Sequence, residues 1–455
     1  MNTSAANSSF PLRRHRQQLS GGLMFLVGLL VIVGETPWLS RNVPPVLIAA
    51  LPALVLCGYF WQRLPLSRAF PKTLMAVLSY VFLTLSYKFL GISTVELGYF
   101  FAGYKFLFVM LAMAAVAPAL SPKQRVWLCV LAAGGLVVNM VDNVRLWMLL
   151  GRRYILFFQG EGRASNVADT SFATAVMLEM GAVFLLALHA RRRWLKRISW
   201  ALVLFSAYFL VAVLQRGITF FLGMALLLLL GLPDSVFRWE RPRALLGPLF
   251  LLLVLAVLLF GGGAEVVLSG LGSLLENQPR IYSRINHLLL FLQTNSLSLT
   301  GGSLAGRINL TLSSIDTFLQ SGTSILVGVG FHHRASAFEL SAGNHSLFFD
   351  TLARYGLLGG CIFIWVLRRI SATVFDVSGL PPRHPLRARL MVFYAMFVLR
   401  AFVGNPFTAS VATQLLVTAP LLVSLLADAG RERSPDPQGL ARNALDALHE
   451  RSGTC

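Results

Sequence analysis

The chain has 455 residues and a formal net charge of +20 at pH 7, and it is 56% hydrophobic and only 13% charged. A soluble domain carries about 25% charged residues, so a chain this apolar, with a mean hydropathy of +0.69, cannot bury its apolar surface in a soluble core. These values predict an all-α polytopic membrane protein. They exclude intrinsic disorder, a collagen-like repeat, a disulfide scaffold and a large soluble catalytic or nucleotide-binding domain.

Apolar stretches of the length that crosses a bilayer, about 20 residues each, recur along the chain. We predict about twelve transmembrane helices between a cytoplasmic segment at 1–20 and a cytoplasmic tail at 427–455. The first stretch follows Arg13, Arg14 and Arg16 as a signal peptide would, but no small-residue cleavage site comes after it, which favours a retained helix. Nine spans fall within 21–262, at 21–35, 43–61, 73–90, 98–119, 126–142, 171–190, 198–215, 217–231 and 244–262, and three within 346–426, at 346–366, 390–404 and 408–426.

The basic residues predict the orientation. Of the 39 lysines and arginines, 25 fall in the two termini and in alternate connections between spans. The positive-inside rule then places both termini in the cytoplasm. Because these charges are scattered over short loops without interleaved aromatic residues, they favour membrane topology over nucleic-acid binding.

Two outward connections are long, at 143–170 and at 263–345. Loops of this length are usually functional or disordered. The second has the periodicity of amphipathic helices around Arg280 to Leu292 and Arg307 to Leu319, followed by a turn at Gly328-Val329-Gly330. We expect it to form a large helical periplasmic loop.

The fourteen basic residues outside the cytoplasmic set are mostly arginines, which suit bidentate phosphate recognition, although a GC-rich genome would give the same bias. Arg216 is the most informative, because it lies where two apolar stretches meet with almost no loop between them. A charge at this depth indicates a functional site; the alternative is an arginine that reaches the outer head groups. The fourteen are Arg41, Lys88, Lys105, Arg145, Arg152, Arg153, Arg163, Arg216, Arg280, Arg284, Arg307, Arg334, Arg354 and Arg400.

The first outward loop contains small residues around Arg163, with Ser165 and Asn166 as further donors. Glycines in this loop would let the backbone approach a ligand. An ordinary capped helix start at Asp169 or Thr170 explains the pattern equally well.

The strongest group of residues closes the second outward loop: the glycine turn at 328–330, then Asn344-His345-Ser346, then Gly356-Leu357-Leu358-Gly359. A histidine at the mouth of the tenth span could act as a general base, because its ordinary pKa of about 6.5 lies near neutral pH. The alternative is a helix-capping or interfacial histidine. His332, His333 and His345 are too few for a metal site, and the chain has no HExxH, GxSxG or Walker A motif, so we expect neither a metal nor a cofactor.

In the order of these parts the chain resembles the O-antigen ligase and polymerase superfamily of bacterial membrane glycosyltransferases. The resemblance covers about residues 150–405. It rests on a basic outer loop, an arginine at an outer helix junction, an arginine-led helix in a long outer loop, a Gly-x-Gly turn and a histidine beside an asparagine. In this chain Asn344 precedes His345, whereas in the family the asparagine follows the histidine.

The resemblance implies a GT-C-type fold in the bacterial inner membrane, acting at the periplasmic face without a nucleotide sugar or an essential metal. The donor would be a glycan on undecaprenyl diphosphate and the acceptor the lipid A core oligosaccharide. The positions that match the family's diphosphate-binding arginines are Arg216 and Arg307, with Arg163 as an addition, and the position that matches its catalytic histidine is His345. The partners expected are these two substrates and membrane lipids, and no nucleic acid.

Other functions stay open at this point. An O-antigen or exopolysaccharide polymerase would use the same donor chemistry on a lipid-linked repeat unit, and transfer of glycans to periplasmic proteins is a smaller possibility. A transporter or flippase with many helices usually binds its cargo near mid-membrane, where Lys105 and Glu179 are the nearest candidates. A single outer cavity lined by Arg216, Arg307 and His345 would favour the transferase.

Overall fold

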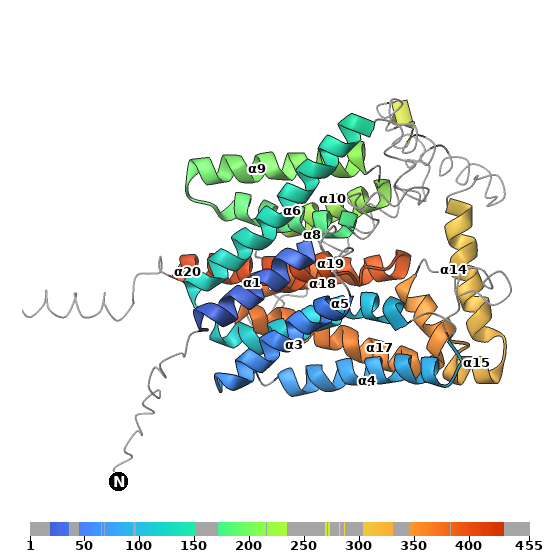
Figure 1. Ribbon diagram of the computed structural model, residues 1–455. Coiled ribbons are helices and arrows are strands. Elements are labelled where there is room, and N and C mark those ends of the chain that lie inside the picture. Colours follow the sequence, from blue (N-terminus) through green and yellow to red (C-terminus); the bar gives the residue numbers. More distant parts are fainter. Residues whose placement is uncertain are drawn as a thin grey trace, which may run out of the picture.

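The protein folds as a helical bundle. The computed structural model describes residues 19–35, 45–64, 66–67, 69–93, 97–150, 172–214, 216–233, 269–270, 272–273, 282, 286, 304–330, 346–382 and 384–431. These residues form helices and no strand (Figure 1). The elements are α1 (Gly21–Glu35), α3 (Pro45–Trp61), α4 (Phe70–Phe89), α5 (Leu97–Val116), η1 (Ala117–Ala119), α6 (Pro122–Leu150), α8 (Phe172–His189), α9 (Arg193–Tyr208), η2 (Phe209–Val213), α10 (Gly217–Gly231), α14 (Leu304–Leu319), α15 (Gly322–Val327), α17 (Leu347–Ser378), α18 (Pro385–Val403), α19 (Ala409–Thr413), η6 (Gln414–Thr418) and α20 (Ala419–Arg431).

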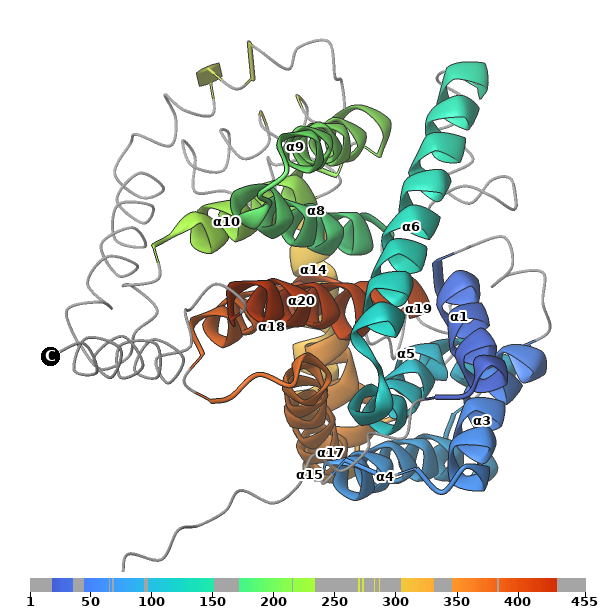
Figure 2. The ribbon, with the colours of Figure 1, turned by 90° about the vertical axis from the view of Figure 1, so that its left-hand side faces the viewer.

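Most of these helices run along one direction, and α14 stands across one end of the bundle (Figure 1). We call this the α14 end. In the view from the opposite end, α18 and α20 occupy the middle, with α8, α9 and α10 on one side and α3, α4, α5 and α17 on the other (Figure 2). The contacts agree, since α8 packs against α9, α10 and α20, and α17 packs against α4, α18 and α20.

Two segments form the interior of the bundle. Buried residues make up 78% of Phe172–His189 and 83% of Ala409–Ala429, compared with 39% or less in the other long apolar helices. A helix that is apolar on every side is expected to be surrounded by other helices. The few polar side chains on these two segments are therefore enclosed by protein.

The outer surface of the bundle is apolar as well. Phe25, Phe82, Val138 and Leu204, on four different helices, each expose about two thirds or more of their surface. Large apolar patches of this kind are rare on soluble monomers. Six described helices are also long and apolar enough to cross a bilayer, so the fold is that of a helical, multi-pass membrane protein.

Eleven of the twelve predicted spans coincide with helices in the described part of the chain, and the span at 244–262 lies outside it. Two helices are longer than predicted. The α6 helix continues to Leu150, because no glycine or proline interrupts 136–150, so the first outward connection begins after that residue and not at 143. The α17 helix continues to Ser378 and ends at Gly379, which has φ 63° and ψ 14°, the left-handed conformation of a helix C-terminus. The predicted amphipathic helix at 307–319 is confirmed as part of α14.

Basic residues gather at the end opposite α14, and hydrogen bonds hold the helix termini together there. Gln124 at the start of α6 donates to the Leu19 carbonyl beside α1 at 3.1 Å. Arg389 at the start of α18 lies 3.1 Å from His189 at the end of α8, and Arg369 donates to the Ala69 carbonyl at the start of α4 at 3.2 Å. We call this the basic end, and it carries the connections that the sequence assigns to the cytoplasm.

Close packing of α8 provides a test of the fold. A Cβ added at Gly181 would come within 2.6 Å of Leu226 and 3.0 Å of Phe393. We expect Gly181→Val to lower the free energy of unfolding by about 1–3 kcal/mol through overpacking, measured as a lower thermal unfolding midpoint in detergent. Gly134→Val is the control, because a Cβ at Gly134 meets no atom within 4 Å. Equal midpoints for the two variants would contradict the packing of α8 against α10 and α18.

Candidate functional site

The structure describes the predicted site residues unequally. Arg216 is described in full, and Arg307 lies within α14, where its backbone alone is described. Arg163 and His345 lie outside the described residues. The site is therefore built from Arg216, from α14 and from the segments that hold the beginning of α17.

Arg216 follows a π-helical segment. In η2 the Leu214 amide donates to the Phe209 carbonyl at 2.9 Å, and the Arg216 amide reaches back to the Leu210 carbonyl at 2.9 Å. The chain then reverses, and α10 begins at Gly217 with Arg216 as its N-cap residue. Because α9 and η2 together rise about 30 Å from the basic end, this junction lies at the α14 end.

The Arg216 side chain is half-buried, not fully exposed to solvent. Single-turn π-helices are frequent at functional sites. Arg216 therefore lies at a junction between two helices, as the sequence predicts.

A break in α17 holds the glycine turn of the second outward loop. Gly356 has φ 61° and ψ −159°, which interrupts the helix. The carbonyls of Ala353 and Arg354 accept hydrogen bonds from the amides of Val329, at 3.0 Å, and Gly330, at 2.8 Å. The glycine turn thus takes the place of the next helical turn in satisfying these carbonyls.

Glycine is required on both sides of this contact. A Cβ at Gly356 would lie 2.4 Å from the Leu326 backbone, and a Cβ at Gly328 would lie 2.4 Å from the Arg354 backbone. The Tyr87 hydroxyl donates to the Val327 carbonyl, and its ring stands edge-on to Tyr355. The glycines that the sequence singles out at 328–330 and 356 therefore dock α15 onto α17.

The first turn of α17 also holds α14. The Ser314 hydroxyl donates to the Asp350 carboxylate at 2.7 Å, and Arg354 lies 3.9 Å from the same carboxylate. Arg307 comes seven residues before Ser314 in the same helix, which is about two helical turns.

Backbone hydrogen bonds fix the residues that follow His345. Ser346 is the N-cap of α17, and its hydroxyl accepts from the Phe349 amide at 3.3 Å. The Leu347 amide donates to the Gly404 carbonyl at 3.1 Å. In sequence, His345 directly precedes this anchored point between α14 and the α18–α19 connection.

Arg400 is a further candidate, which the sequence places among the fourteen basic residues outside the cytoplasmic set without a role of its own. It is 7% exposed, near the α14 end of α18, and its Nε donates to the Thr174 hydroxyl at 3.1 Å. Its guanidinium lies against Gly404, where an added Cβ would be 2.1 Å from the side chain. Since Gly404 binds Leu347, this guanidinium lies close to the start of α17. The signal available in the sequence was an arginine inside an apolar span.

These features make the α14 end suited to an anion. Arg216, which is half-buried, and Arg400, which is buried, lie near helix ends, and charge-assisted hydrogen bonds strengthen as a group is removed from water. Within the described parts of the chain, no group of three or more His, Cys, Asp or Glu side chains could hold a metal ion.

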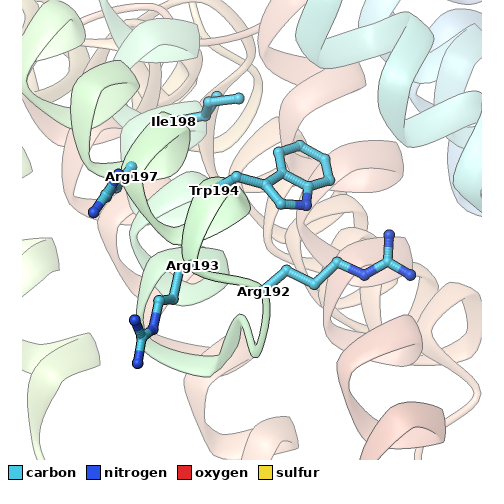
Figure 3. Close-up of a pocket in the computed structure, with 5 residues that line it drawn as sticks. All are labelled: Arg192, Arg193, Trp194, Arg197 and Ile198. Atoms are coloured by element: carbon cyan, nitrogen blue, oxygen red, sulfur yellow. The ribbon is translucent and has the colours of Figure 1, made fainter.

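A shallow hollow at the basic end is a weaker candidate. It lies at the corner between α8 and α9 and is lined by Arg192, Arg193, Trp194, Arg197 and Ile198. Figure 3 shows Arg193 and Arg197 pointing to one side and Arg192 and Trp194 to the other. Their charged groups do not converge on one point, as they would around a bound phosphate.

No protein-family model matches the chain, and no curated protein matches it in sequence.

The docking of the glycine turn can be tested by adding one methyl group. We expect Gly356→Ala to destabilise the protein by about 1–2 kcal/mol for the positive φ and by about 1–3 kcal/mol more for the clash with Leu326. Gly91→Ala is the matched control, because Gly91 has φ +73° but open space around an added Cβ. The measurement is the thermal unfolding midpoint. A midpoint for Gly356→Ala no lower than for Gly91→Ala would contradict the contact.

Proposed function

We propose that the protein is an O-antigen ligase, a membrane glycosyltransferase that moves a polysaccharide from undecaprenyl diphosphate to the lipid A core. The observation that carries this proposal is the position of two arginines, Arg216 and Arg400, at the α14 end, where α14, the helix that contains Arg307, docks beside the start of α17. His345 directly precedes that start in the sequence. A diphosphate is the leaving group that such a set of guanidinium groups would stabilise.

The proposed reaction is an inverting displacement. His345 removes the proton from the acceptor hydroxyl, the acceptor oxygen bonds to the anomeric carbon, and the bond from that carbon to the phosphate oxygen breaks. Negative charge then develops on the undecaprenyl diphosphate that leaves. Arg216, Arg307 and Arg163 hold that charge in this proposal, and no metal takes part.

The proposal includes a topology. We place the basic end in the cytoplasm together with both termini, according to the positive-inside rule, and the α14 end in the periplasm. The protein then crosses the bacterial inner membrane twelve times with a GT-C-type arrangement. Support comes from the segregation of basic side chains to the end opposite α14, seen in the contacts of Arg369 and Arg389.

A polymerase that transfers the same donor to a lipid-linked repeat unit would use the same arginines. A transporter is a different second candidate. The observation in its favour is that Glu179 lies buried within the bundle, on one of its two most enclosed helices. The acceptor that receives the glycan distinguishes the ligase from the polymerase, and the absence of any transfer distinguishes the transporter from both.

The test is transfer in vitro with purified protein, an undecaprenyl-diphosphate glycan and lipid A core, with EDTA present. We expect product from the parent and a loss of about 10²- to 10³-fold in rate for Arg216→Ala, by analogy with removal of one oxyanion donor, and a comparable or larger loss for His345→Ala. Arg197→Ala is the control, because Arg197 lies at the basic end.

Chain extension with lipid-linked repeats but no transfer to lipid A core would replace the ligase with the polymerase. Failure of both reactions by a folded parent would contradict the transferase and favour the transporter.

Arg400 gives a separate test of diphosphate binding. Saturating undecaprenyl diphosphate should stabilise the parent, by about 2.7 kcal/mol at 100 times the dissociation constant. We expect Arg400→Ala to lose most of this shift. Arg400→Lys should recover part of it, since lysine keeps the charge but not the planar fork. An undiminished ligand shift in Arg400→Ala would remove Arg400 from the site.

A further inference from the structure

Two carboxyl groups lie inside the bundle, away from the anion site. Glu35 is the last residue of α1 and is 0% exposed, and Glu179 lies within α8 and is 1% exposed. Glu179 comes seven residues after the start of α8, about 10 Å from its α14-side end. The α8 helix packs against α19 and η6, the segments whose Ser410 and Gln414 bind the Glu35 carboxylate. Both therefore belong to one enclosed polar region in the half of the bundle nearer α14.

Glu35 is held by three helices. One carboxylate oxygen accepts from the Ser410 hydroxyl at 2.8 Å, and the other accepts from the Gln414 amide at 2.8 Å. The Glu35 backbone carbonyl accepts from the Asn139 amide at 2.9 Å. Gly135 leaves room for this side chain, because a Cβ there would lie 3.1 Å from Glu35. This carboxylate has the donors that an ionised group needs.

Glu179 has the opposite surroundings. Both of its carboxylate oxygens are buried, and neither has a hydrogen-bond partner among the described residues. The Gln414 amide oxygen is also buried without a partner, although its NH₂ group binds Glu35. Burying an isolated carboxylate is far more costly than burying its neutral form. The carboxylate oxygens of Glu179 and the amide oxygen of Gln414 are thus buried without a hydrogen-bond partner among the described residues, and Gln414 also binds the Glu35 carboxylate.

The chain widens at this position. Gln414 opens the π-helical segment η6, and α8 packs against η6. A π-helical turn inserts an extra residue and is frequently found where a helix serves a binding site. From the first position of this π-helical segment, the Gln414 amide donates to the Glu35 carboxylate.

Charged groups from the surrounding helices stand at the edges of this region. On α5, Lys105 lines a small void together with Gly34 and Ala409, the neighbours of Glu35 and Ser410. On α18, Arg400 binds Thr174, five residues before Glu179. On α6, Asp142 lies three residues after Asn139. Other titratable groups on the surrounding helices are exposed or bound elsewhere. Arg145 and Tyr208 are exposed, and hydrogen bonds join Tyr104 to Thr84, Tyr394 to the Leu367 carbonyl and Cys129 to the Thr418 carbonyl. The groups that lie toward the basic end are Arg125, Arg389, His189 and Asp428, and α10, α19, η2 and η6 contain no titratable residue.

We propose that Glu35 and Glu179 form a proton-binding site inside the bundle, in which Glu179 carries one proton while Glu35 stays ionised among its donors. Uptake converts one carboxylate and one proton into a carboxylic acid, with no other bond formed or broken. Two buried carboxylates in one enclosed region cannot both be ionised at low cost, and the uneven supply of donors assigns the proton to Glu179. The site stands independently of the transfer reaction, because its test does not use that activity.

Infrared spectroscopy of the full-length protein in lipid nanodiscs tests the proposal. At neutral pH we expect the carbonyl stretching band of a protonated carboxylic acid, moving to lower frequency in D₂O because the proton exchanges with water. Glu179→Gln, which imitates the protonated side chain, should lose the band, and Glu35→Gln should keep it at a shifted frequency. Asp316→Asn, at an exposed acid of α14, should leave it unchanged.

Three results would overturn the proposal. The first is a folded parent without the band, and the second is a band that Glu179→Gln retains in full. The third is a thermal midpoint that rises when sodium replaces choline in the parent but not in Glu179→Gln, because the region would then bind a metal cation. If Glu179→Gln does not fold, the Glu35→Gln variant decides. A carbonyl band that stays at the parent frequency in Glu35→Gln would contradict the pair, because the band would then arise from another acid.

Discussion

The backbone contact between the glycine turn and the break in α17 controls the geometry of the whole α14 end. At the break before Gly356, the carbonyls of two α17 residues, Ala353 and Arg354, accept hydrogen bonds from the amides of Val329 and Gly330. Inside a membrane protein a backbone group left without a partner is very costly, so this exchange holds the two segments in one register. The docked α15 leads directly from α14, and Ser314 of α14 reaches Asp350 only in that register. The docking of α14 against the first turn of α17 follows from the same contact.

Hydropathy predicted the helices because each span has to satisfy its own backbone in lipid, and the apolar stretches of α8 and α20 are read directly from the chain. Helix ends were harder to predict. The α6 helix continues through Asn139, Asp142 and Asn143, polar residues that resemble a loop in a sequence but lie on a helix that extends beyond its apolar part. The sequence does not show that α8 and the segment from α19 to α20 are the most enclosed helices. Their burial depends on contacts between segments that are distant in the chain, which no local pattern encodes.

The candidate site was also predictable only in part. A glycine turn at 328–330 was predictable from composition, and so was the significance of Arg216 at a helix junction. That Gly328 and Gly356 lie in one contact, although 28 residues apart, was not predictable, since besides a positive φ each glycine must avoid a backbone that is distant in the sequence. Arg400 was visible as an arginine in an apolar stretch, but its value comes from Gly404, which makes room for the guanidinium and binds Leu347 in the same turn. Glu35 is the last residue of an apolar stretch, and nothing in the sequence distinguishes it. Only the fold brings Ser410 and Gln414 into contact with it.

The two proposals are linked by charge. Arg400 binds Thr174 on the helix that carries Glu179, so the guanidinium and this carboxyl group are separated by a distance on the order of 10 Å, judged from a rise of about 1.5 Å per residue. At an effective dielectric constant of about 20, two unit charges at about 10 Å interact by roughly 1.7 kcal/mol. A unit negative charge bound at Arg400 would lie at a similar distance from Glu179, so an ionised Glu179 would repel it by an amount of that order, which corresponds to more than a tenfold change in affinity. A proton on Glu179 removes this competition. The acid pair would thereby keep the positive field of the arginine available at the α14 end, although no atom of the pair lies in the anion site.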